Sequence, residues 1–370
     1  MRDVLDDLMR WWHAGEAVGL ATVTGTWKSA PRQAGAAMLV GPDGTASGSV
    51  SGGCVEGAVY ELCREVAETG EAQTVRFGIS DDDAFEVGLT CGGIIELFIE
   101  KVDRHTFPEL PELAAAIAAD RPIALVTGVT GPVAQHLLLT PDGRTGTLGG
   151  DRLDDASTDD GRGLLAAGRT AILHYGPDGQ RRGDGTTLLV SSFAPPARML
   201  VFGATDHAAA VAGIGSFLGY RVTVCDARPV FATKRRFPTA DEVVVDWPHR
   251  YLTAEASAGR IDERTVACVL THDPKFDVPV LEVALRLPLG YVGAMGSRRT
   301  HDDRLKRLRE AGVTPDELAR LSSPIGLDLG ARTPEETAVS VAAEIVGMRW
   351  GGSGLRLTGT DGPIHADATP

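Results

Sequence analysis

The fold of the C-terminal half is decided by the stretch Met199-Leu200-Val201-Phe202-Gly203-Ala204-Thr205-Asp206-His207-Ala208. Its four leading apolar residues predict a short buried strand, and the alanine-rich run at 206–218 predicts the helix after it. Gly203 lies between the two, where the fingerprint of a dinucleotide-binding unit begins. Asp226 ends the next expected strand, at the usual spacing of the acid that binds a ribose. The stretch therefore predicts a Rossmann-like unit.

Strand and helix patterns continue to alternate through this half. Further strands are expected at 221–225, 243–245, 267–270 and 291–295, with helices at 278–287 and 298–310. A last helix is expected after Thr333, because Pro334 suits its first position and Glu336 can complete a capping box. This order predicts an α/β domain at 198–350 that is built on a doubly wound parallel sheet.

One position departs from the dinucleotide fingerprint. Thr205 stands where a middle glycine would let the backbone approach a pyrophosphate, and its branched side chain is expected to obstruct that approach. Asp226 is also expected to repel the 2′-phosphate of NADP. Two alternatives stay open: a site for NAD or another nucleotide adapted around Thr205, or a Rossmann frame with another ligand or a purely structural role.

Other polar residues are expected at the carboxyl ends of these strands, where open α/β sheets bind ligands. Gly296-Ser297 opens a helix beside Arg298 and is a second candidate phosphate cradle, with an ordinary helix cap as the alternative. The candidate cofactor-binding residues of this domain are Gly203, Asp226, His272, Gly296, Ser297 and Arg298.

The N-terminal half contains a glycine-rich run with one cysteine, Gly48-Ser49-Val50-Ser51-Gly52-Gly53-Cys54-Val55-Glu56. Helical spacing follows it, so the run is expected to open a helix and to direct bare backbone N–H groups at an anion. The positive end of the helix dipole would favour the thiolate of Cys54. Glu56 is expected to interact with that dipole rather than to act as a general base.

A second cysteine flanked by paired glycines occurs later in this half, in Cys91-Gly92-Gly93. Paired glycines leave a sulfur in open surroundings, so we expect the two thiols to face each other across one cleft. The remaining cysteines, Cys63, Cys225 and Cys268, lie inside helix or strand patterns and are expected to be small buried hydrophobes. The candidate cofactor-binding residues of this half are Ser51, Gly52, Gly53, Cys54, Cys91, Gly92 and Gly93.

Length and composition limit the remaining possibilities. With 370 residues, two domains are expected: a mixed α+β domain at 1–194, a linker at 194–197, and the α/β domain. Residues 351–370 are expected to form a disordered tail, and no internal repeat is recognisable. A net charge of −14 argues against nucleic acid, and no apolar run suits a membrane span. Five scattered cysteines and no signal sequence favour a cytoplasmic protein.

Motifs in both halves resemble one known family. The N-terminal domain of the XdhC/CoxI family is similar to Ser29-Ala30-Pro31-Arg32, Ser51-Gly52-Gly53-Cys54-Val55-Glu56 and Cys91-Gly92-Gly93. Its Rossmann domain resembles Tyr291-Val292-Gly293-Ala294-Met295-Gly296-Ser297-Arg298-Arg299, Pro324-Ile325-Gly326-Leu327-Asp328-Leu329-Gly330-Ala331 and Thr333-Pro334-Glu335-Glu336. The resemblance is weakest at about 103–195 and ends near 350. It departs at Gly203-Ala204-Thr205-Asp206, where the family commonly has Gly-Ala-Gly-His.

The resemblance implies an accessory protein that binds molybdenum cofactor (molybdopterin). Such a protein supports sulfuration of the cofactor by a cysteine desulfurase and its insertion into xanthine dehydrogenase or a related molybdenum hydroxylase. Molybdopterin carries a phosphate, which suits a helix N-terminus, and a metal for which the thiolates of Cys54 and Cys91 are soft neighbours. A second copy of the chain, in a homodimer, is one further partner to test.

Two other functions stay open from the sequence. One is an NAD(P)-dependent oxidoreductase that uses the C-terminal domain, against which Thr205 counts. The other is a thiol-redox protein that uses Cys54 and Cys91. We expect a cofactor-binding chaperone rather than a catalyst.

Overall fold

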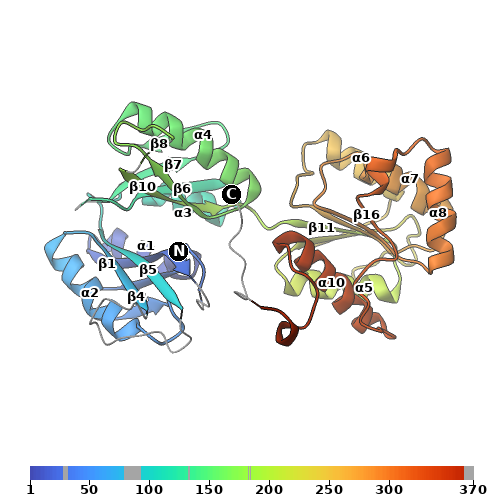
Figure 1. Cartoon of the computed structure of the whole chain (residues 1–370), viewed down its shortest axis with the longest axis horizontal. Coiled ribbons are helices and arrows are strands. Elements are labelled where there is room, and N and C mark those ends of the chain that lie inside the picture. Colours follow the sequence, from blue (N-terminus) through green and yellow to red (C-terminus); the bar gives the residue numbers. More distant parts are fainter. Residues whose placement is uncertain (28–31, 79–92, 132–133, 182, 184, 362–370) are drawn as a thin grey trace. The chain divides into compact units, whose positions relative to one another are not determined.

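The computed structural model describes residues 1–27, 32–78, 93–131, 134–181, 183 and 185–361. The chain divides into two units, Met1–Pro195 and Pro196–Asp361, and Figure 1 shows both. Within the described ranges, no helix is long and apolar enough to cross a bilayer.

The C-terminal unit is built on one parallel sheet of six strands. Its spatial order is β13-β12-β11-β14-β15-β16, the order of a doubly wound dinucleotide-binding fold. The predicted doubly wound sheet is therefore confirmed. The strands are β11 (Arg198–Phe202), β12 (Arg221–Cys225), β13 (Glu242–Val244), β14 (Val266–Val269), β15 (Tyr291–Ala294) and β16 (Leu321–Ser322).

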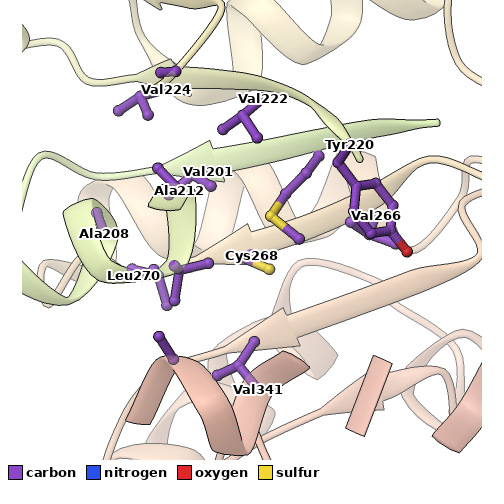
Figure 2. Packing of buried hydrophobic residues seen from close by; sticks show 14 of the residues in the cluster. Val201, Ala208, Ala212, Tyr220, Val222, Val224, Val266, Cys268, Leu270 and Val341 are labelled. Atoms are coloured by element: carbon purple, nitrogen blue, oxygen red, sulfur yellow. The ribbon is translucent and has the colours of Figure 1, made fainter. Parts of the chain in front are cut away.

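Helices cover both faces of this sheet. One face packs against α5 (Asp206–Phe217) and α10 (Pro334–Trp350), and Figure 2 shows the apolar side chains between them and the strands. The other face is covered by α6 (Pro248–Ser257), α7 (Pro274–Ala284) and α8 (Arg298–Glu310), and a single short turn, α9 (Pro315–Leu318), follows α8. The capping box predicted at Thr333 and Glu336 is present.

The first half of the N-terminal unit, which we call the first module, consists of a helix, three strands, a second helix and two strands. Its antiparallel sheet has the order β3-β2-β1-β5-β4. The elements are α1 (Leu5–Ala14), β1 (Val18–Trp27), β2 (Ala37–Val40), β3 (Ala46–Gly48), α2 (Glu56–Thr69), β4 (Gln73–Gly78) and β5 (Ile94–Val102), preceded by a single 3-10 turn (Arg2–Val4).

The second half, the second module, repeats this arrangement. Its sheet order, β8-β7-β6-β10-β9, is the same topology with each strand replaced by its counterpart. The elements are α3 (Leu110–Ala118), β6 (Ile123–Gly128), β7 (Gln135–Leu139), β8 (Arg144–Gly146), α4 (Asp151–Ala167), β9 (Ala171–Tyr175) and β10 (Thr186–Phe193). The expectation that the chain has no internal repeat was therefore wrong. The two modules share a pattern of elements and turns rather than a run of identical residues.

The two modules form a layered structure (Figure 1). Alternate strand residues face opposite sides: Leu20 and Leu125 join one apolar core with α1 and α3, whereas Ala21 and Val126 face α2 and α4 respectively. The first helix of each module thus shares a core with both sheets, and the second helix covers an outer face. α2 and α4 therefore occupy equivalent places on the two sheets.

After α10 the chain continues through Gly351, which ends the helix with a φ of +71°. A single 3-10 turn, Leu357–Gly359, then forms within the segment that was expected to be disordered. Residues 362–370 lie outside the described ranges.

Candidate functional site

The glycine-rich loop before α2 is organised around the carboxylate of Glu56. Glu56 Oε1 accepts hydrogen bonds from Ser49 Oγ at 2.7 Å and from Ser51 N at 2.9 Å. Oε2 accepts from Ser51 Oγ at 2.5 Å, from Gly53 N at 2.8 Å and from Val55 N at 3.2 Å. Partial burial by itself raises the pKa of Glu56, but the hydrogen bonds from Ser51 and Ser49 outweigh it and lower the pKa to about 2. The carboxylate is therefore a permanent negative charge inside the loop at physiological pH.

The two serines use the remaining N–H groups of the loop. Ser49 Oγ accepts from Gly52 N at 2.9 Å. Ser51 Oγ accepts from Cys54 N at 2.9 Å and from Val55 N at 3.1 Å. The expectation that bare N–H groups here face an anionic ligand is therefore corrected, because these N–H groups already donate to the Glu56 carboxylate or to the hydroxyls of Ser49 and Ser51. The residue in the sequence that indicates this arrangement is Glu56. Its carboxylate was expected only to interact with the helix dipole, but it accepts hydrogen bonds along the loop.

Cys54 lies just before the helix, not within its first turn. Helix α2 begins at Glu56 with Val55 as its cap, and Cys54 precedes the cap. Gly52 and Gly53 have φ values of +77° and +120°, which favour glycine and lie outside the helical range. The Cys54 side chain is half-buried and packs against the core between α2 and the sheet. The loop thus presents one sulfur at the rim of an apolar core.

Described residues that flank the other motifs of this half lie at the same end of the first sheet as the Cys54 loop. The strand pairing brings three strand ends to one end of this sheet: Gly48 at the end of β3, Trp27 at the end of β1 and Ile94 at the start of β5. Gly93, which is buried, directly precedes β5 there. Cys91, Gly92 and residues 29–31 lie outside the described ranges, so the expected approach of Cys91 to Cys54 stays a prediction.

The second module has a counterpart of this loop between β8 and α4. In the first module Ser49 N donates to Ala37 O at 3.0 Å, and in the second Thr147 N donates to His136 O at 3.1 Å. Asp154 accepts from Thr147 Oγ1 at 2.8 Å and from Leu148 N at 2.7 Å, as Glu56 accepts from Ser49 and Ser51. Thr147 and Asp154 therefore correspond to Ser49 and Glu56 at the same sequence spacing.

The two loops differ in the residue at the position of Cys54. Counting from the aligned glycines Gly48 and Gly146, that residue in the second module is Arg152. It is exposed and lies within the first turn of α4, which begins earlier than α2 relative to the carboxylate. A carboxylate-bound loop is thus common to both modules, whereas the thiol is particular to the first.

The three cysteines that were expected to be inert are buried, as predicted. Desolvation raises the pKa of Cys63, Cys225 and Cys268 to about 12 in each case. Among the described residues, no group of three or more His, Cys, Asp or Glu side chains is placed to hold a metal ion. A metal role for Cys54 and Cys91 therefore stays a prediction.

In the C-terminal unit, the loop after β11 is tightly packed. Gly203 has a φ of +115°, and a Cβ there would lie 3.0 Å from the backbone of Leu270 and Thr271. Thr205 caps α5, because its Oγ1 accepts from Ala208 N at 3.1 Å. Thr205 therefore satisfies a helix N–H group that a ligand could otherwise use.

Asp226 directly follows β12, and its carboxylate accepts hydrogen bonds both from the loop after β11 and from its own loop. Its Oδ2 accepts from Ala204 N at 2.7 Å, its Oδ1 accepts from Arg228 N at 2.8 Å, and the Arg228 guanidinium bonds both oxygens at 2.9 and 2.7 Å. Burial alone would raise the pKa of Asp226, but Arg228 and the backbone donors lower it. Asp226 is 3% exposed and Arg228 is 44% exposed. The expected repulsion of a 2′-phosphate stays a prediction, and the pairing of Asp226 with the more exposed Arg228 counts against it.

The other candidates of this unit occupy the same edge of the sheet as ordinary caps and surface residues. Ser297 caps α8 by accepting from Thr300 N at 3.2 Å, and Arg298 and His272 are exposed. Beneath them lies a buried ion pair that sequence inspection missed, in which Arg304 donates to Asp277 at 3.0 Å and to Met295 O. Arg304 is one of five arginines in the charged α8 sequence, so the sequence carries no signal that this one is buried.

The fold and loops define a class of protein: a duplicated α+β unit, with a cysteine in the loop before the second helix of its first module, followed by a Rossmann unit. Comparisons with known proteins agree with both parts. A model described as the XdhC Rossmann domain matches residues 199–345, and one described as the XdhC and CoxI family matches residues 11–78 and 116–176. The chain belongs to the XdhC/CoxI family. Both stretches of the second match run from the first helix of a module to its fourth strand.

Similar proteins extend over nearly the whole chain. A Bacillus subtilis protein, described as a probable subunit of xanthine dehydrogenase, is 28% identical over 90% of this chain and 93% of its own length. The molybdenum cofactor insertion chaperone PaoD of Escherichia coli is 29% identical over 91% of this chain and 85% of its own length. A Bacillus halodurans crystal structure described as a xanthine dehydrogenase matches with a TM-score of 0.66 at 24% identity, covering 93% of this chain and 95% of that one. The last match concerns the fold.

Proposed function

We propose that this chain is an accessory protein that binds molybdenum cofactor and aids its insertion into a molybdenum hydroxylase of the xanthine dehydrogenase type. The observation that carries the proposal is Cys54, a half-buried thiol on a loop held by Glu56, within a segment that matches the family model. The insertion chaperone PaoD, similar over 91% of this chain, supports the same role.

The residues of the loop fit one end of the cofactor better than the other. A thiolate is a soft ligand, so Cys54 suits the molybdenum and its sulfur ligands. When bound, the cofactor supplies the metal centre that the client enzyme uses. The phosphate of the cofactor does not fit the loop, because the N–H groups of the loop already donate to Glu56 and to the two serines. We therefore assign Cys54 to the metal end and leave the phosphate to residues outside this loop.

Several finer steps belong to the same proposal. A cysteine desulfurase would sulfurate the cofactor while this protein holds it, and Cys91 would join Cys54 at the site. We expect these events in the cytoplasm, where thiols such as Cys63, Cys225 and Cys268 stay reduced. A homodimer is testable by light scattering of the purified protein.

The test measures cofactor retention. Protein purified from cells that make molybdopterin is analysed for molybdenum by elemental analysis and for pterin by fluorescence after oxidation. We expect Cys54→Ala to lose most of both while unfolding at the parent's temperature, because alanine fits the open glycine loop. Arg152→Ala, at the corresponding place in the second module, is the matched control and should retain the cofactor. Equal retention by Cys54→Ala would refute the role of the thiol.

The C-terminal unit supports a second, smaller proposal: modest binding of NAD or another nucleotide at the end of β11. The doubly wound sheet order and the tight turn at Gly203 favour it. Asp226 is already bonded, so a ribose would have to displace Arg228. Calorimetric titration with NAD and NADP tests the site, and Thr205→Gly should strengthen binding if the branched side chain obstructs a pyrophosphate. No gain in Thr205→Gly would contradict that obstruction.

A further inference from the structure

The two modules offer an internal comparison at the loop that carries Cys54. Both modules place a glycine of positive φ at the end of the third strand, Gly48 at +80° and Gly146 at +94°. At both, an added Cβ would meet a carbonyl oxygen of the second strand, at 2.3 Å from Ala37 O and 2.4 Å from His136 O. The chain therefore enters the two loops in the same way, and later differences arise within the loops.

The carboxylates that organise the loops differ in length and in reach. Asp154 bonds the hydroxyl of Thr147 and the N–H of Leu148, both at the start of its loop. Glu56 is one methylene longer and bonds groups along the whole loop, from Ser49 to Gly53 and Val55. The longer side chain thus reaches N–H groups that in a helix would lie in the first turn.

The loop conformations follow this difference. In the second module the chain becomes helical at Asp151, and Arg152 lies in that turn with its side chain exposed. In the first module Gly53 N and Cys54 N donate to Glu56 and Ser51, and the helix begins only at Glu56. Cys54 is consequently half-buried against the core rather than exposed on a helix.

We infer that Glu56 is a positioning residue for Cys54: its carboxylate holds residues 51–55 out of the helix and so keeps the thiol at the rim of the core. The second module shows the conformation of the same scaffold with the shorter carboxylate and with other residues at the places of Ser51, Gly53 and Cys54. The inference concerns the placement of the sulfur, and it rests on the proposed function only where cofactor retention is measured.

The experiment compares the parent with Glu56→Asp and Glu56→Gln. The rate at which iodoacetamide alkylates Cys54 is followed by peptide mass mapping across a range of pH, which separates Cys54 from Cys91. The buried thiols, whose pKa values are raised to about 12, react slowly and do not interfere. Cofactor retention and the thermal midpoint are measured on the same samples.

We expect both variants to fold, to alkylate Cys54 about fivefold faster or more because the sulfur becomes exposed, and to retain about tenfold less cofactor. The opposite directions of these two changes distinguish positioning from a general loss of structure. Asp154→Asn is the matched control in the second module and should change neither quantity. An alkylation rate within about twofold of the parent in both variants would overturn the inference.

Two further outcomes distinguish the positioning role of Glu56 from the proposed contact between Cys54 and the cofactor. Faster alkylation with unchanged cofactor retention would uphold the positioning role and refute the proposed contact between Cys54 and the cofactor. If the Glu56 variants fail to fold, Ser51→Gly replaces them, because Ser51 Oγ bonds both Cys54 N and Glu56 and the second module has Gly149 at this place. Unchanged alkylation in folded Ser51→Gly would then overturn the inference.

Discussion

The first and second modules of the N-terminal unit have the same elements in the same order, but they differ at the loop that precedes the second helix. The first has a serine-rich loop with Glu56 and a thiol, and the second has a shorter, more helical loop with Asp154 and an arginine. Their sheets, turns and apolar layers correspond, so the scaffold alone does not explain the thiol. The comparison separates what the module needs in order to fold from what its first copy adds.

The entry into each loop should be the most sensitive point of the comparison. Gly48→Ala and Gly146→Ala each place a Cβ against a strand carbonyl at a positive φ, so each should lower the free energy of unfolding by about 2–4 kcal/mol. Urea unfolding measures both. A large loss in one variant and none in the other would show that the two loops do not correspond.

Removing the charge of the loop carboxylate should lower the free energy of unfolding more in the first module than in the second. Glu56→Gln should lower the free energy of unfolding by about 1–3 kcal/mol, because its amide nitrogen must face an N–H of either Ser51 or Gly53. In Asp154→Asn the amide can donate to Thr147 Oγ1 while its oxygen accepts from Leu148 N, so the loss should stay below about 1 kcal/mol. Equal losses, measured by urea unfolding, would contradict the difference in bonding.

The contribution of Glu56 should also depend on pH. Its pKa is about 2 in the folded protein and 4.5 as the ordinary value, so its stabilising effect is complete above about pH 4.5 and is lost as the pH falls towards 2. The difference in free energy of unfolding between the parent and Glu56→Gln should therefore shrink between pH 4.5 and 2. Urea unfolding at pH 7 and at about pH 3 measures it, and a difference that grows on acidification would be inconsistent with a carboxylate acceptor.

The smallest effect is expected at a glycine pair further along the loops. Gly52 has a φ of +77° and its counterpart Gly150 has a φ of −169°, and an added Cβ meets nothing within 4 Å at either. Gly52→Ala should therefore cost about 1 kcal/mol and Gly150→Ala about 0.5 kcal/mol or less. Thermal unfolding of the pair tests whether the first loop alone needs a left-handed residue here.

Local sequence patterns predicted the fold of the C-terminal unit, its last helix and the loop that carries Cys54. Strand and helix alternation after Arg198 predicted the doubly wound sheet, because each buried strand and amphipathic helix is encoded locally. Thr333, Pro334 and Glu336 marked the last helix for the same reason. The motif around Cys54 pointed to the family and to the thiol, since a glycine-rich loop before a helix is readable from residue types and spacing alone.

Tertiary structure decided what the individual residues do. The internal repeat lies in the topology and hydrogen bonding of two equivalent sheets, one containing β1 and the other β6, and not in residue identities. Glu56 and Asp226 were assigned from sequence to a helix dipole and to a ribose. The Glu56 carboxylate instead accepts from N–H groups of its own loop, and the Asp226 carboxylate accepts from Arg228 N and from Ala204 N of the neighbouring loop. A sequence shows that a charge and its donors are near each other along the chain. Only the folded backbone determines which N–H groups point at the carboxylate and which stay available to a ligand.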